Sequence, residues 1–264
     1  MSTGLEITSS GLRAHLDESD WAALAIGTGA NLAAAELRPL PDTAASGAQH
    51  DDALIEAARL ALGGGLVRLA AISGTGDTGA LAQIGTDLHA AGIAIRALTP
   101  APDGSGPVGV PGVEVGANTA GNVIAEVMRL FPAAGLKRST GRGPITMSHD
   151  MSVTLVQALK DGKTSLANTI ASQAGFDEPP EVMRSLANGT TASLTLTVRV
   201  AGQTTAAMRH WLLADVGWVQ LAVRQHQVTH IVMQRDEIRD DLLLLLTGAY
   251  ETAATFAELT RSDG

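Results

Sequence analysis

Four β-strand patterns follow one another at hairpin spacing in the second half of this sequence. The first, residues 193–201, alternates strictly, with Leu194, Leu196 and Val198 on one face and polar side chains on the other, which is the period of a half-buried strand. The next three cover residues 206–213, 218–224 and 228–233. Connections this short join antiparallel strands, because a parallel crossover needs about a dozen residues or more. The pattern predicts an antiparallel sheet that is followed by a helix over residues 235–246.

The first half of the chain carries a similar succession of elements. A helix is predicted over residues 51–62, where Leu54, Ala57 and Ala61 have helical spacing and Gly63 favours termination. Strands are predicted at residues 5–8, 21–28, 66–73, 80–87, 92–98 and 113–115. Further helices are predicted at residues 11–17, capped by Ser9 or Ser10, and from Asn118 or Thr119 to Phe131. The Pro- and Gly-rich stretches 38–49 and 100–111 favour loops.

Residues 133–144 carry Gly, Ser and positive charge without apolar periodicity, which is typical of a linker. This linker divides one compact domain into an N-terminal αβ half, residues 1–132, and a C-terminal αβ half, residues 145–250, before a flexible tail, residues 251–264. The C-terminal half begins with a strand at 145–147, a helix capped by Ser148 or Asp150 that ends at Leu159, a helix capped by Thr164 or Ser165 that ends at Ala174, and a helix over 181–187. Each half ends with a strand that leads into an amphipathic helix, at residues 113–131 and 228–246, which indicates a repeated pattern.

Composition excludes several classes of function. The 264 residues include no cysteine, which rules out disulfides, cysteine-ligated zinc, iron–sulfur clusters and a thiol nucleophile. The net charge is −9 and no block of Lys or Arg stands out, so nucleic-acid binding is not expected. No apolar run approaches the roughly 20 residues of a membrane span, and residues 1–20 lack the pattern of a signal peptide. The expected location is the cytoplasm.

Gly74–Gly79, with the sequence Gly-Thr-Gly-Asp-Thr-Gly, is the sharpest local motif. It follows an apolar run, as a dinucleotide-binding fingerprint does, and in that interpretation residues 80–91 would form a helix. The next strand should then end in an acidic residue that binds the ribose hydroxyls, but it ends Arg96-Ala97-Leu98-Thr99. The favoured interpretation is a Gly-rich hairpin turn. An NAD(P)-dependent oxidoreductase with Gly74–Gly79 as its phosphate-binding loop remains the alternative.

Other polar clusters do not form a recognisable catalytic or metal site. The seven histidines lack metal-ligand spacing with a supporting carboxylate. Ser148, His149 and Asp150 have the residue types of a hydrolase triad, but adjacent residues cannot converge as a triad must. The acidic residues after Arg235 fit the start of a helix, where the helix dipole favours carboxylates. We therefore expect no catalytic residues, no cofactor and no metal.

The remaining candidate site is a polar strand face. Thr195, Thr197 and Arg199 lie opposite the apolar face of their strand, and neighbouring strands contribute Trp211, Trp218 and Gln220. The two Trp side chains either fill the core or belong to an open sheet face that takes a protein partner, where Trp and Arg often dominate the binding energy. These six residues are the predicted partner-binding set.

Laid out in this way, nearly the whole chain resembles the EspG family of ESX (type VII) secretion-associated proteins. The similarity runs through the strand and helices of residues 145–174, the turn Gly175–Val182, Trp211 with the hairpin segment Gly217–Leu221, and the final strand and helix of residues 228–246. In the first half, residues 66–98 resemble the family's run of hairpin strands, with Gly74–Gly79 as a turn.

The resemblance implies an α+β fold with a pseudo-two-fold repeat and a central antiparallel sheet flanked by two helical subdomains. It also implies a non-enzymatic cytosolic chaperone that binds the PPE protein of a PE–PPE heterodimer and keeps it soluble for export. A further alternative is a family member that has lost PPE binding and has a structural or regulatory role.

Overall fold

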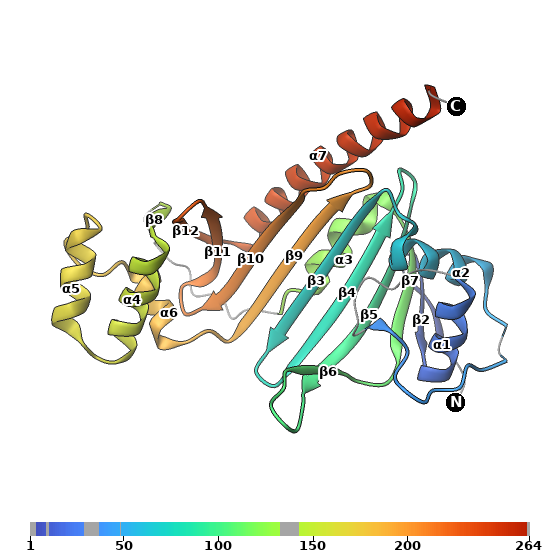
Figure 1. The fold of residues 1–264 in the computed structure, drawn as a ribbon, viewed down its shortest axis with the longest axis horizontal. Coiled ribbons are helices and arrows are strands. Elements are labelled where there is room, and N and C mark those ends of the chain that lie inside the picture. The colour runs from blue at the N-terminus through green and yellow to red at the C-terminus, as the bar shows by residue number, and fades with distance from the viewer. Residues whose placement is uncertain (1–3, 9–10, 29–36, 48, 133–142, 263–264) are drawn as a thin grey trace. The chain divides into compact units, whose positions relative to one another are not determined.

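The computed structural model describes residues 4–8, 11–28, 37–47, 49–132 and 143–262 (Figure 1). The chain divides into two compact units, each assembled from separate segments. Unit 1 comprises residues 1–131, 196–208 and 241–264, and unit 2 comprises residues 132–195 and 209–240. The predicted linker, residues 133–144, lies almost entirely outside the described residues, and the predicted domain boundaries stay predictions.

Unit 1 is built on a sheet in which the neighbouring strands follow the order β1-β2-β7-β5-β4-β3-β9, with β6 beside β5. The strands are β1 (Gly4–Thr8), β2 (Gly11–Leu16), β3 (Val67–Thr75), β4 (Thr78–Thr86), β5 (Ala90–Pro100), β6 (Pro107–Gly109), β7 (Val113–Thr119) and β9 (Ala192–Val200). Strands β3, β4 and β5 form consecutive antiparallel hairpins. These hairpins agree with the strands predicted at residues 66–73, 80–87 and 92–98.

Two short elements near the start of unit 1 differ from their prediction. Residues 11–16 form strand β2 rather than a helix, because they pair with β1 on one side and β7 on the other. Residues 18–27 form helix α1 (Glu18–Gly27) rather than a strand. The Asp17 carboxylate caps α1 by accepting a hydrogen bond from the Asp20 backbone N–H at 3.0 Å. Trp21 and Leu24 of α1 then enter the core of unit 1.

A second helical segment lies very close to the sheet of unit 1. It consists of α2 (Asp52–Arg59), which continues into the π-helical turn η2 (Leu60–Gly64). Gly85 of β4 and Gly92 of β5 are directly paired across the sheet. A Cβ atom on Gly85 would lie 1.7 Å from the Leu60 carbonyl oxygen, and one on Gly92 would lie 1.8 Å from that of Ala57. The two glycines therefore allow the helix backbone to rest directly on the sheet.

The C-terminal helix α7 (Arg235–Ser262) is longer than predicted, because it continues beyond Leu246 through residues 251–262. Its later part belongs to unit 1. The Tyr250 hydroxyl lies 3.2 Å from the Thr86 hydroxyl of β4. The Phe256 ring covers Gly202, where an added Cβ would lie 2.3 Å from a ring carbon. Helix α7 therefore contacts strands and turns from both halves of the sequence.

Unit 2 contains a sheet, in the order β9-β10-β11-β12-β8, the helices α4, α5 and α6, and the first residues of α7. The strands besides β9 are β10 (Ala206–Ala214), β11 (Gly217–Arg224), β12 (Gln227–Met233) and β8 (Ile145–Ser148). The helices are α4 (His149–Lys160), α5 (Thr164–Gln173) and α6 (Glu181–Asn188). Ser148 caps α4 through its hydroxyl, which accepts from the Met151 N–H at 3.2 Å. Helix α5 instead starts after Lys163, without a side-chain cap.

The core of unit 2 joins the helices to one face of its strands. It includes Leu155 of α4, Ile170 of α5, Met183 of α6 and Val219 of β11. In unit 1, β7 leads through the 3₁₀ turn η3 (Ala120–Asn122) into α3 (Val123–Arg129), much as β12 leads into α7. The predicted α+β class with a large antiparallel sheet is confirmed.

Candidate protein-binding site

The six residues of the predicted partner-binding set differ in burial: three are buried and three are more accessible. Trp211, Trp218 and Gln220 retain 0%, 1% and 6% of their accessible surface. Trp211 of β10 pairs directly with Gln220 of β11, and Leu213 pairs with Trp218, so the two Trp side chains share one buried sheet face. In this structure both Trp residues fill the core, which is one of the two interpretations that their positions allowed.

The other three members of the set are more accessible. Arg199 is exposed, whereas Thr195 and Thr197 are half-buried. The Thr195 hydroxyl shares a 2.7 Å hydrogen bond with Nδ1 of His210. His210 directly precedes Trp211 in β10, and consecutive strand side chains point to opposite faces. Thr195 therefore lies on the sheet face opposite the buried Trp pair, and the six residues do not form one continuous patch.

Gly74–Gly79 forms the turn of an antiparallel hairpin. Thr75, the last residue of β3, pairs with Thr78, the first residue of β4, and Gly76 between them has a φ of 56°, which favours glycine. The segment after the turn is strand β4 rather than the helix that a dinucleotide fold requires. The phosphate-binding interpretation of this motif is therefore wrong.

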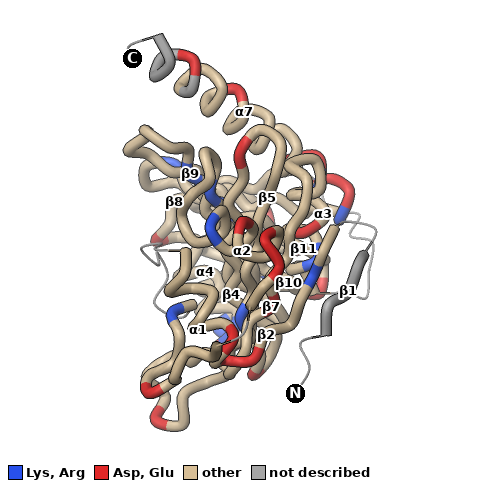
Figure 2. The backbone as a smooth tube through the Cα atoms, turned by 90° about the vertical axis from the view of Figure 1, so that its right-hand side faces the viewer, with Lys and Arg blue, Asp and Glu red and all other residues tan. Residues whose placement is uncertain are grey.

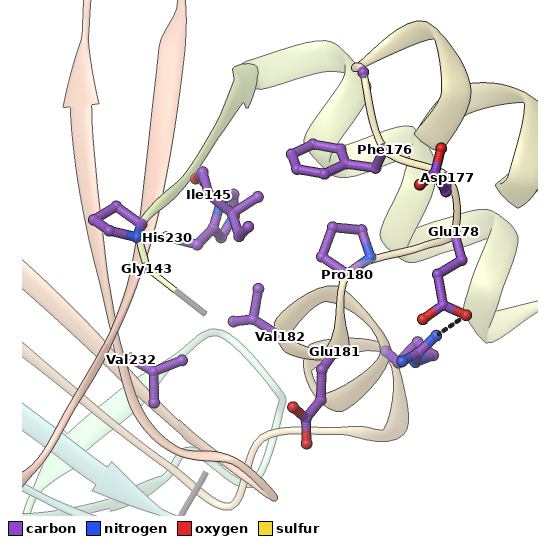
Figure 3. A pocket seen from close by; sticks show the side chains of 13 residues that line it. Gly143, Ile145, Phe176, Asp177, Glu178, Pro180, Glu181, Val182, His230 and Val232 are labelled. Carbon is purple, nitrogen blue, oxygen red and sulfur yellow. Dashed lines mark hydrogen bonds and ion pairs between the residues drawn. The ribbon is translucent and has the colours of Figure 1, made fainter. Parts of the chain in front are cut away.

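Described residues of unit 2 line a groove of about 820 Å³. One wall comes from the turn before α6 and the first residues of that helix, and the other comes from β8 and β12 (Figure 3). We call it the α6 groove. Its walls are defined by Phe176, Pro180 and Val182 on one side and by Ile145, His230 and Val232 on the other. The groove presents apolar surface at the junction between helices and strand edge.

Acidic side chains surround the α6 groove. Asp177, Glu178 and Glu181 line it, and all three are exposed. The cation in its lining is Arg184, whose guanidinium lies 3.5 Å from the Glu178 carboxylate. Along the rest of the described backbone, basic and acidic positions are interspersed, as Figure 2 shows in blue and red. The whole chain is acidic, with a net charge of −9, and in this groove the acidic side chains lie beside apolar ones.

His230 anchors the strand wall of the groove. Its Nε2 shares a 3.1 Å hydrogen bond with the Ser152 hydroxyl of α4, and its Nδ1 lies 3.4 Å from the Ile145 carbonyl oxygen of β8. Burial lowers the pKa of His230, although the contact with the Ile145 carbonyl acts in the opposite direction. The imidazole is therefore neutral at neutral pH and adds no positive charge to the groove.

The sequence contains a motif that forms one wall of this groove, but it does not predict the groove itself. The turn Gly175–Val182 is a motif of the sequence, but its role as a wall depends on the approach of β8 and β12, which are about 30 and about 50 residues away along the chain. Helix α5 ends just before Gly175, whose φ of 85° favours glycine, and Pro180 is the N-cap residue of α6. These two residues are the sequence signals that place Phe176 outside both helices.

The described residues contain no cluster of three or more His, Cys, Asp or Glu side chains that could hold a metal ion. Within the same part of the chain, the helices are too short or too polar to cross a membrane.

Comparison with solved structures identifies a similar fold. The structure of the Mycobacterium tuberculosis type VII secretion system chaperone EspG5 in complex with the PE25-PPE41 dimer matches with a TM-score of 0.60. The match covers 86% of this chain and 93% of that one, at 10% sequence identity. A variant of the PpsC dehydratase domain from Mycobacterium tuberculosis, also 10% identical, gives a TM-score of 0.16 over 88% and 98% of the two chains, which is too low to indicate a shared fold. No protein-family model and no curated protein matches the sequence.

Proposed function

We propose that this protein is a cytoplasmic chaperone of a type VII secretion system, which binds the PPE-type protein of a PE–PPE pair and keeps it soluble for export. The observation that carries the proposal is the fold shared over most of the chain with a chaperone solved in complex with a PE–PPE dimer. The α6 groove supports it, since an open apolar surface on a stable framework suits the binding of an apolar helical tip.

The α6 groove is the main binding site that we propose for such a client. Phe176 is half-buried and faces the cavity, so a partner side chain can cover its remaining surface. Aromatic residues at the centre of an interface often contribute a large share of its binding energy. Thr195, Thr197 and Arg199, which retain exposed surface, are proposed as further contacts. The buried members of the set would stabilise the strands that carry these contacts; they are Trp211, Trp218 and Gln220.

Co-expression with candidate PE–PPE pairs tests the function directly. The pairs to use are those encoded beside this gene, because a chaperone and its clients are often encoded together. We expect one pair to remain soluble and to co-elute with the protein in size-exclusion chromatography. If none of the neighbouring pairs binds, the alternative of a structural member without PPE binding replaces this proposal.

A matched pair of substitutions locates the client on the groove. Phe176→Ala should weaken binding of the pair by about tenfold or more, as truncation of a central aromatic does. Leu166→Ala is the control, because Leu166 is 45% exposed on α5 and does not line the groove. Equal affinities for the two variants in calorimetry would place the client elsewhere on the protein.

A further inference from the structure

We propose that the α6 groove selects a basic side chain, so that its partner inserts a Lys or Arg beside an apolar helical surface. The inference rests on the proposed function only for the identity of the partner. The charge preference itself follows from the groove and can be tested without any client protein.

The apolar part of the groove accommodates the stem of such a side chain. Phe176, Pro180 and Val182 face Ile145 and Val232 across the cavity. Lys and Arg have long apolar stems that pack on surfaces of this kind while the charged head stays near water. The Phe176 ring can also attract a cation that lies over its face.

The carboxylates at the rim provide the complementary charge. Glu178 already has Arg184 as a partner at 3.5 Å. In the part of the chain that the structure describes, neither Asp177 nor Glu181 forms an ion pair. Glu181 stands at the first position of α6, and Figure 3 shows its carboxylate at the lower edge of the groove, away from the Glu178–Arg184 pair.

The same charges disfavour the opposite kind of partner. An acidic side chain in this groove would meet Asp177 and Glu181 without a cation to offset the repulsion, since Arg184 pairs with Glu178 and burial keeps His230 neutral. Like-charge contact is one of the ways in which an interface rejects wrong partners. The groove therefore attracts a basic side chain and also rejects an acidic one.

Two labelled peptides provide the test. Each is a helix of about 18 residues, or roughly five turns, with Leu next to Lys at its centre in one peptide and Leu next to Glu in the other. Fluorescence anisotropy with the full-length protein should show tighter binding of the Lys peptide by about fivefold or more at low salt. That preference should shrink as ionic strength rises from about 50 to about 300 mM.

Charge reversal on the protein completes the design. Glu181→Lys should remove the preference for the Lys peptide and restore binding of the Glu peptide, a gain that misfolding cannot produce. Glu251→Lys is the matched control, because Glu251 is also exposed but lies on α7, outside the groove. A preference that survives Glu181→Lys, or that Glu251→Lys abolishes as well, overturns the proposal.

The outcomes separate this inference from the proposed function. If a PE–PPE pair binds wild type and Glu181→Lys equally and the peptides show no charge preference, the inference fails while the chaperone function stands. If the Lys peptide binds selectively but no PE–PPE pair binds, the charge preference of the groove stands while the chaperone function fails. If the peptides bind more tightly after Lys137, Arg138 and Arg142 are all replaced by Ser, the chain's own basic segment is the occupant, and the assignment to a partner is overturned.

Discussion

Arg96 of β5 and Glu18 of α1 form a two-pronged ion pair inside unit 1, with Nη1–Oε2 and Nη2–Oε1 distances of 2.7 Å and 2.9 Å. The Arg96 side chain is fully buried. Its guanidinium also donates to the carbonyl oxygens of Val110 and Arg38, and the Glu18 carboxylate accepts from the N–H groups of Leu40 and Gly112. One charged pair thus holds a helix, a strand and two loops together.

Removal of one member of this pair should strongly destabilise the protein. Arg96→Met leaves the Glu18 carboxylate without its main partner, and loss of one member of a buried ion pair costs about 3–5 kcal/mol of unfolding free energy. The double variant Arg96→Met, Glu18→Leu should recover a large part of that loss, because no unpaired charge remains. Urea denaturation of the two variants measures both effects, and equal stabilities would contradict the prediction.

The same carboxylate should make stability depend on acidic pH. Burial raises the pKa of Glu18, but hydrogen bonds from Arg96, Gly112 and Leu40 outweigh it, so the pKa lies below its usual value of 4.5. A lowered folded pKa adds stability that is complete above the unfolded pKa and is lost as the pH falls through the folded one. Glu18→Gln should therefore lose stability at neutral pH and show a shallower decline below about pH 4.5 than wild type.

The glycines beneath α2 should not tolerate even a methyl group. Gly85→Ala and Gly92→Ala would each place a Cβ atom within 2 Å of a helix carbonyl oxygen, so the helix or the sheet must move. We expect a loss of at least about 2 kcal/mol for each variant in urea denaturation. Gly27→Ala is the control, since nothing lies within 4 Å of its added Cβ and a change within about 0.5 kcal/mol is expected.

Buried His230 should make unit 2 sensitive to mildly acidic pH. Burial lowers the pKa of this imidazole below its usual 6.5, and burial has the same effect on His210. A histidine of this kind stabilises the fold above the unfolded pKa, and that stability decreases as the pH falls toward the folded pKa. Urea midpoints between about pH 7.5 and about pH 5.5 should fall less steeply in His230→Asn than in wild type. An unchanged slope in that variant would assign the pH dependence to other groups.

The predicted partner-binding set should divide into stability residues and surface residues. Trp218→Ala removes a buried ring and should cost about 3–5 kcal/mol of unfolding free energy. Arg199→Ala changes an exposed side chain and should stay within about 0.5 kcal/mol. If Arg199 contacts the client as proposed, its replacement weakens binding in calorimetry without any change in the urea midpoint. A large loss of stability in Arg199→Ala would mean that its side chain supports the fold.

Long sequence patterns led to correct predictions of secondary structure, whereas short patterns led to wrong ones. Strand β9 alternates over nine residues, so its period was unmistakable. The apolar segment that begins at Trp21 is short, and periodicity cannot distinguish a buried strand from a helix over such a length. Residues 11–16 became a strand because β1 and β7 pair with them, which is a long-range effect.

The candidate site was harder to predict than the fold for the same physical reason. Trp211 and Trp218 could be placed on a sheet, but which face is covered depends on packing that the strand itself does not encode. The α6 groove joins the Phe176 turn to strands that are distant in sequence, and only the folded chain brings them together.

The segmented construction of unit 1 has a consequence for its synthesis. Tyr250 and Phe256 contact Thr86 and Gly202 respectively, so part of the unit's packing comes from residues near the end of the sequence. Ribosomes release the N-terminal part first, and on the order of ten seconds pass between the emergence of residue 131 and that of residue 241 at usual elongation rates. Until β9 emerges, the nascent sheet presents β3 as an open edge, the kind of surface that attracts unwanted strands. During its own synthesis, the proposed chaperone therefore exposes a strand edge that can pair with other chains.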